Sequence, residues 1–370
     1  MHLKDIVARR ITLNDDESKA NVAVMESTVY ALLEAMKRQD PLFKTLFQKL
    51  VFTGSYYDGL RITPPAEFDL DMILHLPISP ADIMMEQTNA AAYKYYKLRR
   101  PLEHIFGPYH PHWELFKNMS GFFDNQLYLL RNGVQKWIQG LISTVVHLGT
   151  FVIPRAVEKV TISLTGPAFT LHIYPTYGRT RQIDVDLVPA IDESNLPFPP
   201  GLVKPNRFAG LQEEAKVFYL IPKPFEAPAA VSSDNPRYWR VSFPEAEKQL
   251  LYSGELGCVK ILIKLLKFLR DTENWQGVAS YYIKTMFFYE IDEHQYVDYW
   301  KEDNLGIRFL DMLKKFRDII YRQNLPYYFG RQTNLLSGLS GSTANNIKYR
   351  LDRIISNIER DPSQVNVYMP

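Results

Sequence analysis

The sequence predicts an α+β protein with two lobes: a mixed β-sheet lobe on a long N-terminal helix, and a C-terminal lobe of bundled helices. Segments that alternate apolar and polar residues, as strands do, are concentrated between residues 51 and 189. Eight of the 24 prolines lie between Pro189 and Pro228, too many for regular structure. Helical periodicity dominates after Pro244. We therefore divide the chain into residues 1–195, the sheet lobe, and residues 196–370, the helical lobe.

The elements of the sheet lobe follow from local periodicity. Apolar residues at helical spacing predict one long helix from Asp16 to Leu50, and a break at Asp40-Pro41 is left open. Residues 81–150 are expected to contain several helices. Alternation predicts strands over the following ranges: Val51–Thr53, Phe68–His75, Val157–Leu164, Phe169–Pro175 and Arg181–Pro189.

Further helices are predicted from the same 3.6-residue period. One lies in the sheet lobe, at Asn125–Val146. Those of the helical lobe are Phe243–Arg270, Val278–Glu290, Leu305–Arg322 and Thr343–Arg360.

Composition indicates a packed globular protein and excludes several classes. Of the 370 residues, 46% are hydrophobic and 13% aromatic, unlike a disordered chain. No apolar run is long enough for a secretory signal or a membrane span, so we expect no association with a membrane. A single cysteine is typical of a reducing compartment, so we expect a cytoplasmic protein. The net charge is only +2, so any nucleic-acid surface must be a local patch.

The segment Thr53–Leu74 carries the strongest chemical signal. Strand alternation places Glu67, Asp69 and Asp71 on one face and the apolar residues between them on the other. Adjacent carboxylates in a half-buried strand are costly unless they are neutralised, and a divalent cation with oxygen ligands does this. Gly54 lets the backbone approach a phosphate, and Ser55 offers hydrogen-bond donors to it. This combination indicates a nucleotidyltransferase site.

A second acidic strand supplies the missing carboxylate. In Gln182–Pro189, Asp184 and Asp186 share one face. Three carboxylates can hold two metal ions, for which we expect Mg²⁺, with Mn²⁺ as the alternative. For either strand alone, a solvated acidic face is an equally good interpretation. An assignment shifted to Asp69 with Asp71 is also left open.

Three further segments occur in an order that resembles cyclic GMP–AMP synthase and its Mab relatives, within the DNA-polymerase-β-like nucleotidyltransferases. They are Trp239–Phe243 followed by Glu247, Cys258–Lys264, and Ser280–Phe288. The vertebrate DNA sensor has a zinc ribbon after the first of these segments. Here Cys258 is the only cysteine, which cannot form such a site. The chain is therefore similar to the cyclic GMP–AMP synthase-like receptors that lack the ribbon.

The resemblance implies a role for each matching residue. Glu67, Asp69 and Asp186 would bind the metal ions and serve catalysis, while Gly54 and Ser55 would hold the triphosphate. The implied nucleotide contacts from the helical lobe and its approach are Arg240, Ser242, Glu247, Lys260, Lys264, Ser280 and Tyr281. Plainer interpretations are a solvated helix face for the two lysines and a core position for the tyrosine.

The resemblance also implies the reaction and its regulation. ATP and GTP would be joined in two phosphoryl transfers into a cyclic dinucleotide, a cyclic GMP–AMP-like messenger for innate immune and antiviral signalling. Double-stranded RNA, rather than DNA, would activate the enzyme through a basic patch, and oligomerisation on the nucleic acid is left open. The patch residues are Lys37, Arg38, Lys44 and Lys49, although a solvated helix face explains the same charges.

Two other functions share parts of this pattern. One is a catalytically silent Mab-type interaction protein, against which the intact carboxylates Glu67, Asp69 and Asp186 argue. The other is a transferase that makes linear oligonucleotides, of the 2′-5′ oligoadenylate type. The product distinguishes them, because only a cyclic dinucleotide synthase closes a ring of two nucleotides.

Overall fold

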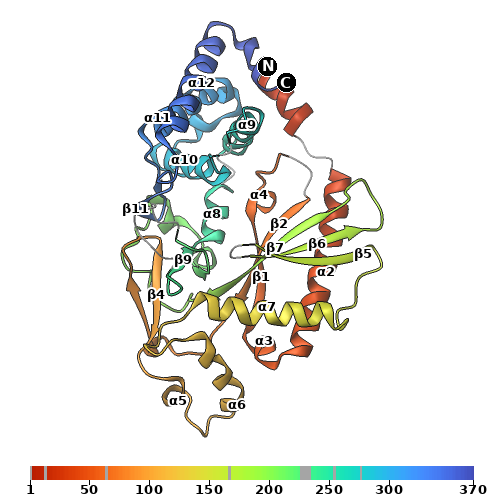
Figure 1. The fold of residues 1–370 in the computed structure, drawn as a ribbon. Coiled ribbons are helices and arrows are strands. Elements are labelled where there is room, and N and C mark those ends of the chain that lie inside the picture. Colours follow the sequence, from red (N-terminus) through yellow and green to blue (C-terminus); the bar gives the residue numbers. More distant parts are fainter. Residues whose placement is uncertain are drawn as a thin grey trace.

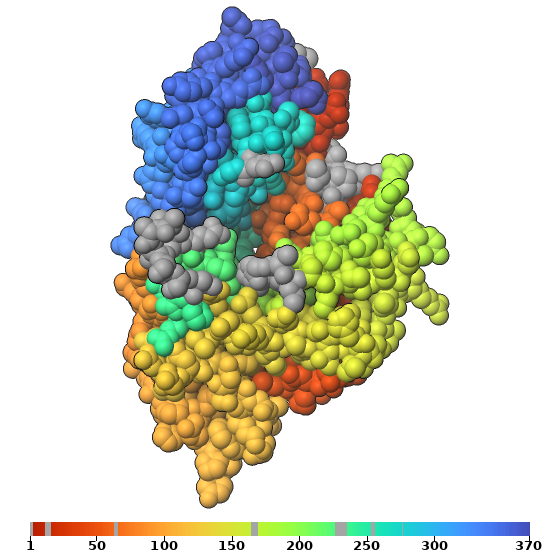
Figure 2. Space-filling view, in the orientation of Figure 1, coloured from red at the N-terminus to blue at the C-terminus, as the bar shows by residue number. Residues whose placement is uncertain are grey.

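A computed structural model of the chain describes residues 2–11, 15–62, 66–165, 168–225, 235–252, 256–275 and 277–370. The predicted α+β architecture is confirmed: a curled mixed sheet with a long N-terminal helix stands beside a helical C-terminal part (Figure 1). In the space-filling view the orange N-terminal segment is exposed between the teal and blue helices and the lime strands (Figure 2). The two parts therefore meet across the segment that carries the acidic motif.

The N-terminal helix is shorter than predicted. After α1 (His2–Ile6) and a π-helical turn (Val7–Ile11), α2 runs over Asp15–Gln39 and α3 over Pro41–Leu46. The Asp40 side chain accepts hydrogen bonds from the backbone N–H groups of Leu42 and Phe43, at 2.7 and 3.1 Å, and so caps α3. The break that the sequence left open at Asp40-Pro41 is present, because the cap and Pro41 start a new helix. The predicted helix to Leu50 was wrong only beyond Leu46, where β1 begins at Phe47.

Nine strands form one sheet within the described residues. They are β1 (Phe47–Thr53), β2 (Glu67–Leu74), β3 (Ile83–Gln87), β4 (Tyr93–Leu98), β5 (Val157–Thr165), β6 (Ala168–Pro175), β7 (Ile183–Asp192), β8 (Tyr219–Ile221) and β9 (Trp239–Ser242). Their order is β1-β2-β7-β8-β9-β4-β3, and β6 pairs with β7 and with β5. Strands β2 and β7 are parallel, and the other pairs are antiparallel.

Four of these strands were not predicted. Strands β3 and β4 lie in the region where helices were expected, and β8 and β9 follow the proline-rich segment. Since β8 and β9 continue the sheet beyond residue 195, the sheet draws on both predicted parts of the chain. The division at residues 195/196 stays a prediction.

Helices cover the sheet and bury its apolar face. Helix α7 (Arg131–His147) crosses the sheet lobe beside α2 (Figure 1). The apolar residues Met25, Val29, Leu32 and Met36 of α2 are at most 1% exposed and belong to the core. The helix predicted from Asn125 starts only at Arg131, because Leu127 has a positive φ of 68° and Phe123 pairs with Leu129 in a turn.

The C-terminal part is helical apart from one hairpin. It contains α8 (Pro244–Leu250), α9 (Val259–Thr272), α10 (Ser280–Glu293), α11 (Leu305–Arg322), α12 (Gly341–Arg360), α13 (Val365–Tyr368), and the strands β10 (Pro326–Tyr327) and β11 (Gly330–Asn334). The single helix predicted over residues 243–270 was wrong, since α8 ends at Leu250 and α9 starts at Val259. Helix α11 has the predicted bounds, and the Ser340 side chain caps α12.

The remaining helices are short. They are α4 (Gly54–Tyr57), α5 (Leu102–Ile105), α6 (Trp113–Phe116) and 3₁₀ turns at Pro80–Asp82, Lys117–Phe122, Asn206–Gly210, Glu213–Ala215, Val297–Trp300, Glu302–Asn304 and Pro362–Gln364. Across the described ranges, the model contains no helix with the length and hydropathy that a membrane crossing requires.

Candidate active site

The parallel pairing of β2 with β7 brings the two acidic strands together. Asp69 of β2 stands directly beside Asp186 of β7, and Glu67 stands beside Asp184. The Asp186 carboxylate accepts a hydrogen bond of 2.6 Å from the Thr170 hydroxyl of β6, which fixes its position. Carboxylates from two segments more than a hundred residues apart therefore share one edge of the sheet.

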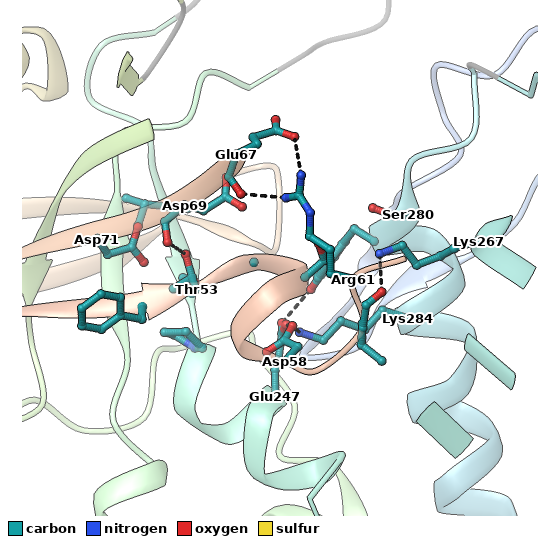
Figure 3. Close-up of a pocket in the computed structure, with 18 of the residues that line it drawn as sticks. Thr53, Asp58, Arg61, Glu67, Asp69, Asp71, Glu247, Lys267, Ser280 and Lys284 are labelled. Carbon is teal, nitrogen blue, oxygen red and sulfur yellow. Dashed lines mark hydrogen bonds and ion pairs between the residues drawn. The ribbon is translucent and has the colours of Figure 1, made fainter. Parts of the chain in front are cut away.

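The charges of these carboxylates act on one another. Confinement in the cleft, followed by the charges of Asp186 and Glu67, raises the pKa of Asp69 to about 6. Glu67 is turned toward Arg61, whose guanidinium lies 3.9 Å from the Glu67 carboxylate and donates to the Glu67 carbonyl at 2.7 Å (Figure 3). Arg61 thus compensates part of the negative charge of Glu67 and Asp69, and no described residue forms an ion pair with Asp69 or Asp186.

The three carboxylates do not yet form a compact ligand set. Among the described residues, one set of three potential metal ligands has all its ligand atoms within 4.8 Å, and this is Glu290, Glu293 and His294. That set already has a cation, because Lys315 contacts Glu290 and lies 2.7 Å from Glu293. Glu67 would therefore have to leave Arg61 to join Asp69 and Asp186 around a cation.

The Gly54-Ser55 turn lies against the same carboxylates. It opens α4, directly after β1, and Gly54 has a φ of +78°. A Cβ atom on Gly54 would lie 2.1 Å from the Asp69 Oδ2 atom, so a side chain at position 54 cannot fit without moving Asp69. Glycine is thus required here both for its backbone conformation and for the close approach to a carboxylate.

A cavity of about 390 Å³ connects this edge of the sheet to the helical part. It is within the size range of small-molecule sites. Of the predicted residues, those that line it are Gly54, Ser55, Glu67, Asp69, Arg240, Ser242, Glu247, Ser280 and Tyr281. Asp186, Lys260 and Lys264 do not line it. Asp186 is one strand away from Asp69, and Lys260 lies over the Tyr252 ring at 4.4 Å.

One wall of the cavity is aromatic and cationic. The Arg240 guanidinium lies 5.6 Å from the Tyr281 ring and 5.5 Å from the Tyr327 ring. The Tyr281 hydroxyl donates to Glu247 at 2.8 Å. Tyr281 is thus held by a hydrogen bond while it lines the cavity, which suits a rigid surface for a flat ligand.

Sequence reasoning missed the cations that bind the loop after α4. Lys284 of α10 bridges Asp58, at 2.6 Å, and Glu247 of α8, at 2.9 Å (Figure 3). Lys267 of α9 donates to the Leu60 carbonyl at 2.7 Å. Helical spacing offered one signal, because Lys284 is three residues after Tyr281 on the same helix. No sequence signal identified Arg61 or Lys267, since their partners are defined only by the fold.

The predicted basic patch is divided between paired and unpaired side chains. Lys37 is 2.7 Å from Glu34 and Lys49 is 3.9 Å from Glu245. Arg38 and Lys44 are exposed, and neither forms an ion pair with a described residue. All four lie between the end of α2 and β1, as the sequence places them.

Comparison with known proteins identifies the family of the chain. Residues 56–253 match the model of the Mab-21 protein nucleotidyltransferase domain, and residues 258–353 match that of the Mab-21 protein HhH/H2TH-like domain. A cyclic GMP-AMP synthase-like receptor of Aethina tumida is 31% identical over 99% of this chain and 90% of its own length. A cyclic GMP-AMP synthase-like receptor of Tribolium castaneum is 32% identical over 98% of this chain and 89% of its own length. The predicted family is confirmed: the chain belongs to the Mab-21 nucleotidyltransferase family.

Proposed function

We propose that this chain is an active nucleotidyltransferase that joins ATP and GTP into a cyclic dinucleotide when it binds double-stranded RNA. The observation that carries the proposal is the pairing of Asp69 with Asp186 next to Gly54, at one end of a cavity with an aromatic wall. Relatives named cyclic GMP-AMP synthase-like receptors support the cyclic product. A messenger of this kind would serve innate immune signalling. Such a receptor would act in the cytoplasm.

The carboxylates fit a divalent cation. All the donors are oxygen atoms, and the pKa of Asp69 is raised because its confinement in the cleft and the charges of Asp186 and Glu67 disfavour its ionised form. Glu67, Asp69 and Asp186 would hold Mg²⁺, with Mn²⁺ as a substitute. When bound, such ions neutralise charge on the reacting phosphate and on the departing pyrophosphate.

The residues of the chain would position the two nucleotides. Gly54 and Ser55 would contact a triphosphate, and Lys267 and Arg61 contribute positive charge to the same cavity. Asp186 would accept the proton of the attacking sugar hydroxyl as the new P–O bond forms and the bond to pyrophosphate breaks. A second transfer of the same kind closes the ring. Arg240 and Tyr281 would hold the bases.

A direct assay of products tests this function. The protein is incubated with labelled ATP and GTP, Mg²⁺ and either duplex RNA, duplex DNA or neither, and the products are then treated with phosphatase. We expect a phosphatase-resistant cyclic dinucleotide only with RNA, and none from Glu67→Ala/Asp69→Ala. A ladder of linear products would instead identify an oligonucleotide-forming transferase, and the absence of product in every condition would contradict the proposal.

The proposed binding of double-stranded RNA can be tested separately. Arg38 and Lys44 are exposed without ion-pair partners, so Arg38→Glu/Lys44→Glu should weaken RNA binding and flatten its dependence on salt concentration. Lys37 and Lys49 already face carboxylates, so the matched double variant Lys37→Glu/Lys49→Glu should have the smaller effect. Equal effects of the two double variants would argue against this patch as the contact.

A further inference from the structure

Three side chains on neighbouring strands form a hydrogen-bonded chain of serine, histidine and aspartate. The Ser163 hydroxyl of β5 lies 2.8 Å from Nε2 of His172 on β6, and Nδ1 of the same ring lies 2.6 Å from Oδ1 of Asp184 on β7. In this geometry a histidine can activate a serine, because nucleophile and base are within hydrogen-bond reach and a third group orients the base. None of the three residues lines the cavity of the candidate active site.

The register of the sheet produces this arrangement. Asp184 is directly opposite His172 in the β6–β7 pair, and Ser163 is opposite Thr170, two residues before His172 on β6. Residues two apart on a strand share a face, so the serine reaches the ring diagonally. Among the described strands β5 pairs only with β6, and the His172 side chain is 24% exposed. A small reagent can therefore approach Ser163 at this edge of the sheet.

The hydrogen bonds indicate which ring nitrogen of His172 carries the proton. The Gln182 side-chain amide donates to Oδ1 of Asp184 at 2.7 Å, so this oxygen is an acceptor. The amide nitrogen also lies 3.2 Å from Nδ1, but its shorter contact decides its direction. Nδ1 then donates to Oδ1, and Nε2 accepts from the Ser163 hydroxyl. His172 is thus held in the tautomer that can take a proton from serine, and Asp184 is the positioning residue.

We propose that Ser163 is an activated nucleophile that takes acyl groups from small carboxylic esters, in a second reactive site of this chain. Ser163 Oγ forms a bond to the carbonyl carbon of the ester while its proton passes to Nε2 of His172. The bond from that carbon to the leaving alcohol then breaks, and His172 returns the proton to the alcohol. Water releases the acyl group from Ser163 by the same two steps. The site does not depend on nucleotide transfer, so its test is independent of the proposed function.

Acetylation by 4-nitrophenyl acetate tests this proposal. The full chain is treated with the ester, and peptide mass spectrometry measures the initial rate at which each serine is acetylated. Ser194 is the internal reference, because it is exposed and its hydroxyl is not hydrogen-bonded to a described histidine. We expect Ser163 to react at least about 100-fold faster than Ser194, which is the contribution of a general base. His172→Gln keeps hydrogen-bonding groups but has no basic nitrogen, so it should lose about 100-fold in the rate at Ser163.

A set of hydrogen bonds that only joins the strands would give a different result. Ser163 and Ser194 would then react at the same rate, or His172→Gln would leave the rate at Ser163 unchanged, and either outcome overturns the inference. If His172→Gln does not fold, ¹⁵N magnetic resonance of the wild-type ring decides: a proton on Nδ1 supports the inference, and a proton on Nε2 contradicts it. Asp184→Ala tests the positioning role, since it should move the ring proton to Nε2 and slow acetylation of Ser163 but not of Ser194.

Discussion

Replacement of Lys284 by methionine should destabilise the protein more than any other single lysine change at the site. Lys284 is 9% exposed and bridges Asp58 and Glu247, each 8% exposed. Burial alone lowers the pKa of Lys284, but the carboxylates of Glu247 and Asp58 outweigh it and leave the pKa above its ordinary value. Methionine would leave two buried carboxylates without a cation, which costs about 3–5 kcal/mol. We therefore expect a fall of roughly 6–10 °C in the unfolding temperature.

Thermal unfolding at pH 7.5 measures this effect. Lys264→Met is the matched control, because no described residue forms an ion pair with Lys264, and its midpoint should change little. Neutralising both carboxylates in Lys284→Met/Asp58→Asn/Glu247→Gln should restore at least half of the lost stability, since nothing charged is then left unpaired. If Lys284→Met has the same unfolding temperature as the wild type, or if the triple variant is no more stable than Lys284→Met, the bridge does not hold the two parts together.

Three further predictions concern the same region. Gly54→Ala should reduce turnover at least about 100-fold, since its Cβ would clash with Asp69. Gly107→Ala is the control: Gly107 also has a positive φ, of +69°, but a Cβ there meets no neighbouring atom within 4 Å, so this variant should keep full activity in the same assay. Asp69→Asn should abolish Mn²⁺ binding, as measured by electron paramagnetic resonance. Asp184→Asn should retain Mn²⁺ binding, because the wild-type Asp184 carboxylate is already held by His172 at 2.6 Å. Burial lowers the pKa of Lys267 to about 8, so the unfolded state binds more protons than the folded state between pH 8 and 10.5. The free energy of unfolding of the wild type, measured in urea, should therefore rise relative to that of Lys267→Met by on the order of 3 kcal/mol over that range. A difference between the two proteins that does not change with pH would contradict this prediction.

Local patterns predicted the parts of the fold that depend on local spacing. Helix α11 has the predicted bounds, Leu305–Arg322, because its apolar stripe is continuous and its ends are marked. The acidic faces of β2 and β7 were predicted because alternation fixes which side chains share a face. What alternation cannot give is register between strands, and the neighbourhood of Asp69 and Asp186 depends on it.

The errors have physical causes of the same kind. Residues 47–50 were assigned to a helix because their apolar spacing suits either period, and pairing with β2 decides the matter. Strands β3 and β4 were missed because Lys94 and Lys97 interrupt an aromatic run, although Lys94 is buried in the fold. The cations around the loop after α4 come from helices more than 200 residues away, so no local pattern could reveal them.

The path of the sheet has a consequence for synthesis on the ribosome. Hairpin β3–β4 is complete once residue 98 has emerged, but among the described strands it joins the rest of the sheet through β9 alone, at the pairs Tyr93↔Arg240 and Lys94↔Trp239. Residues 127–129 bond to β4 soon after it is made. The nascent chain must nevertheless carry a hairpin that is not joined to the rest of the sheet while about 140 more residues are translated, which at usual elongation speeds takes roughly 7–30 s. Exposed strand edges during that interval invite pairing with other chains, so translation speed and chaperone supply should govern the soluble yield of this protein.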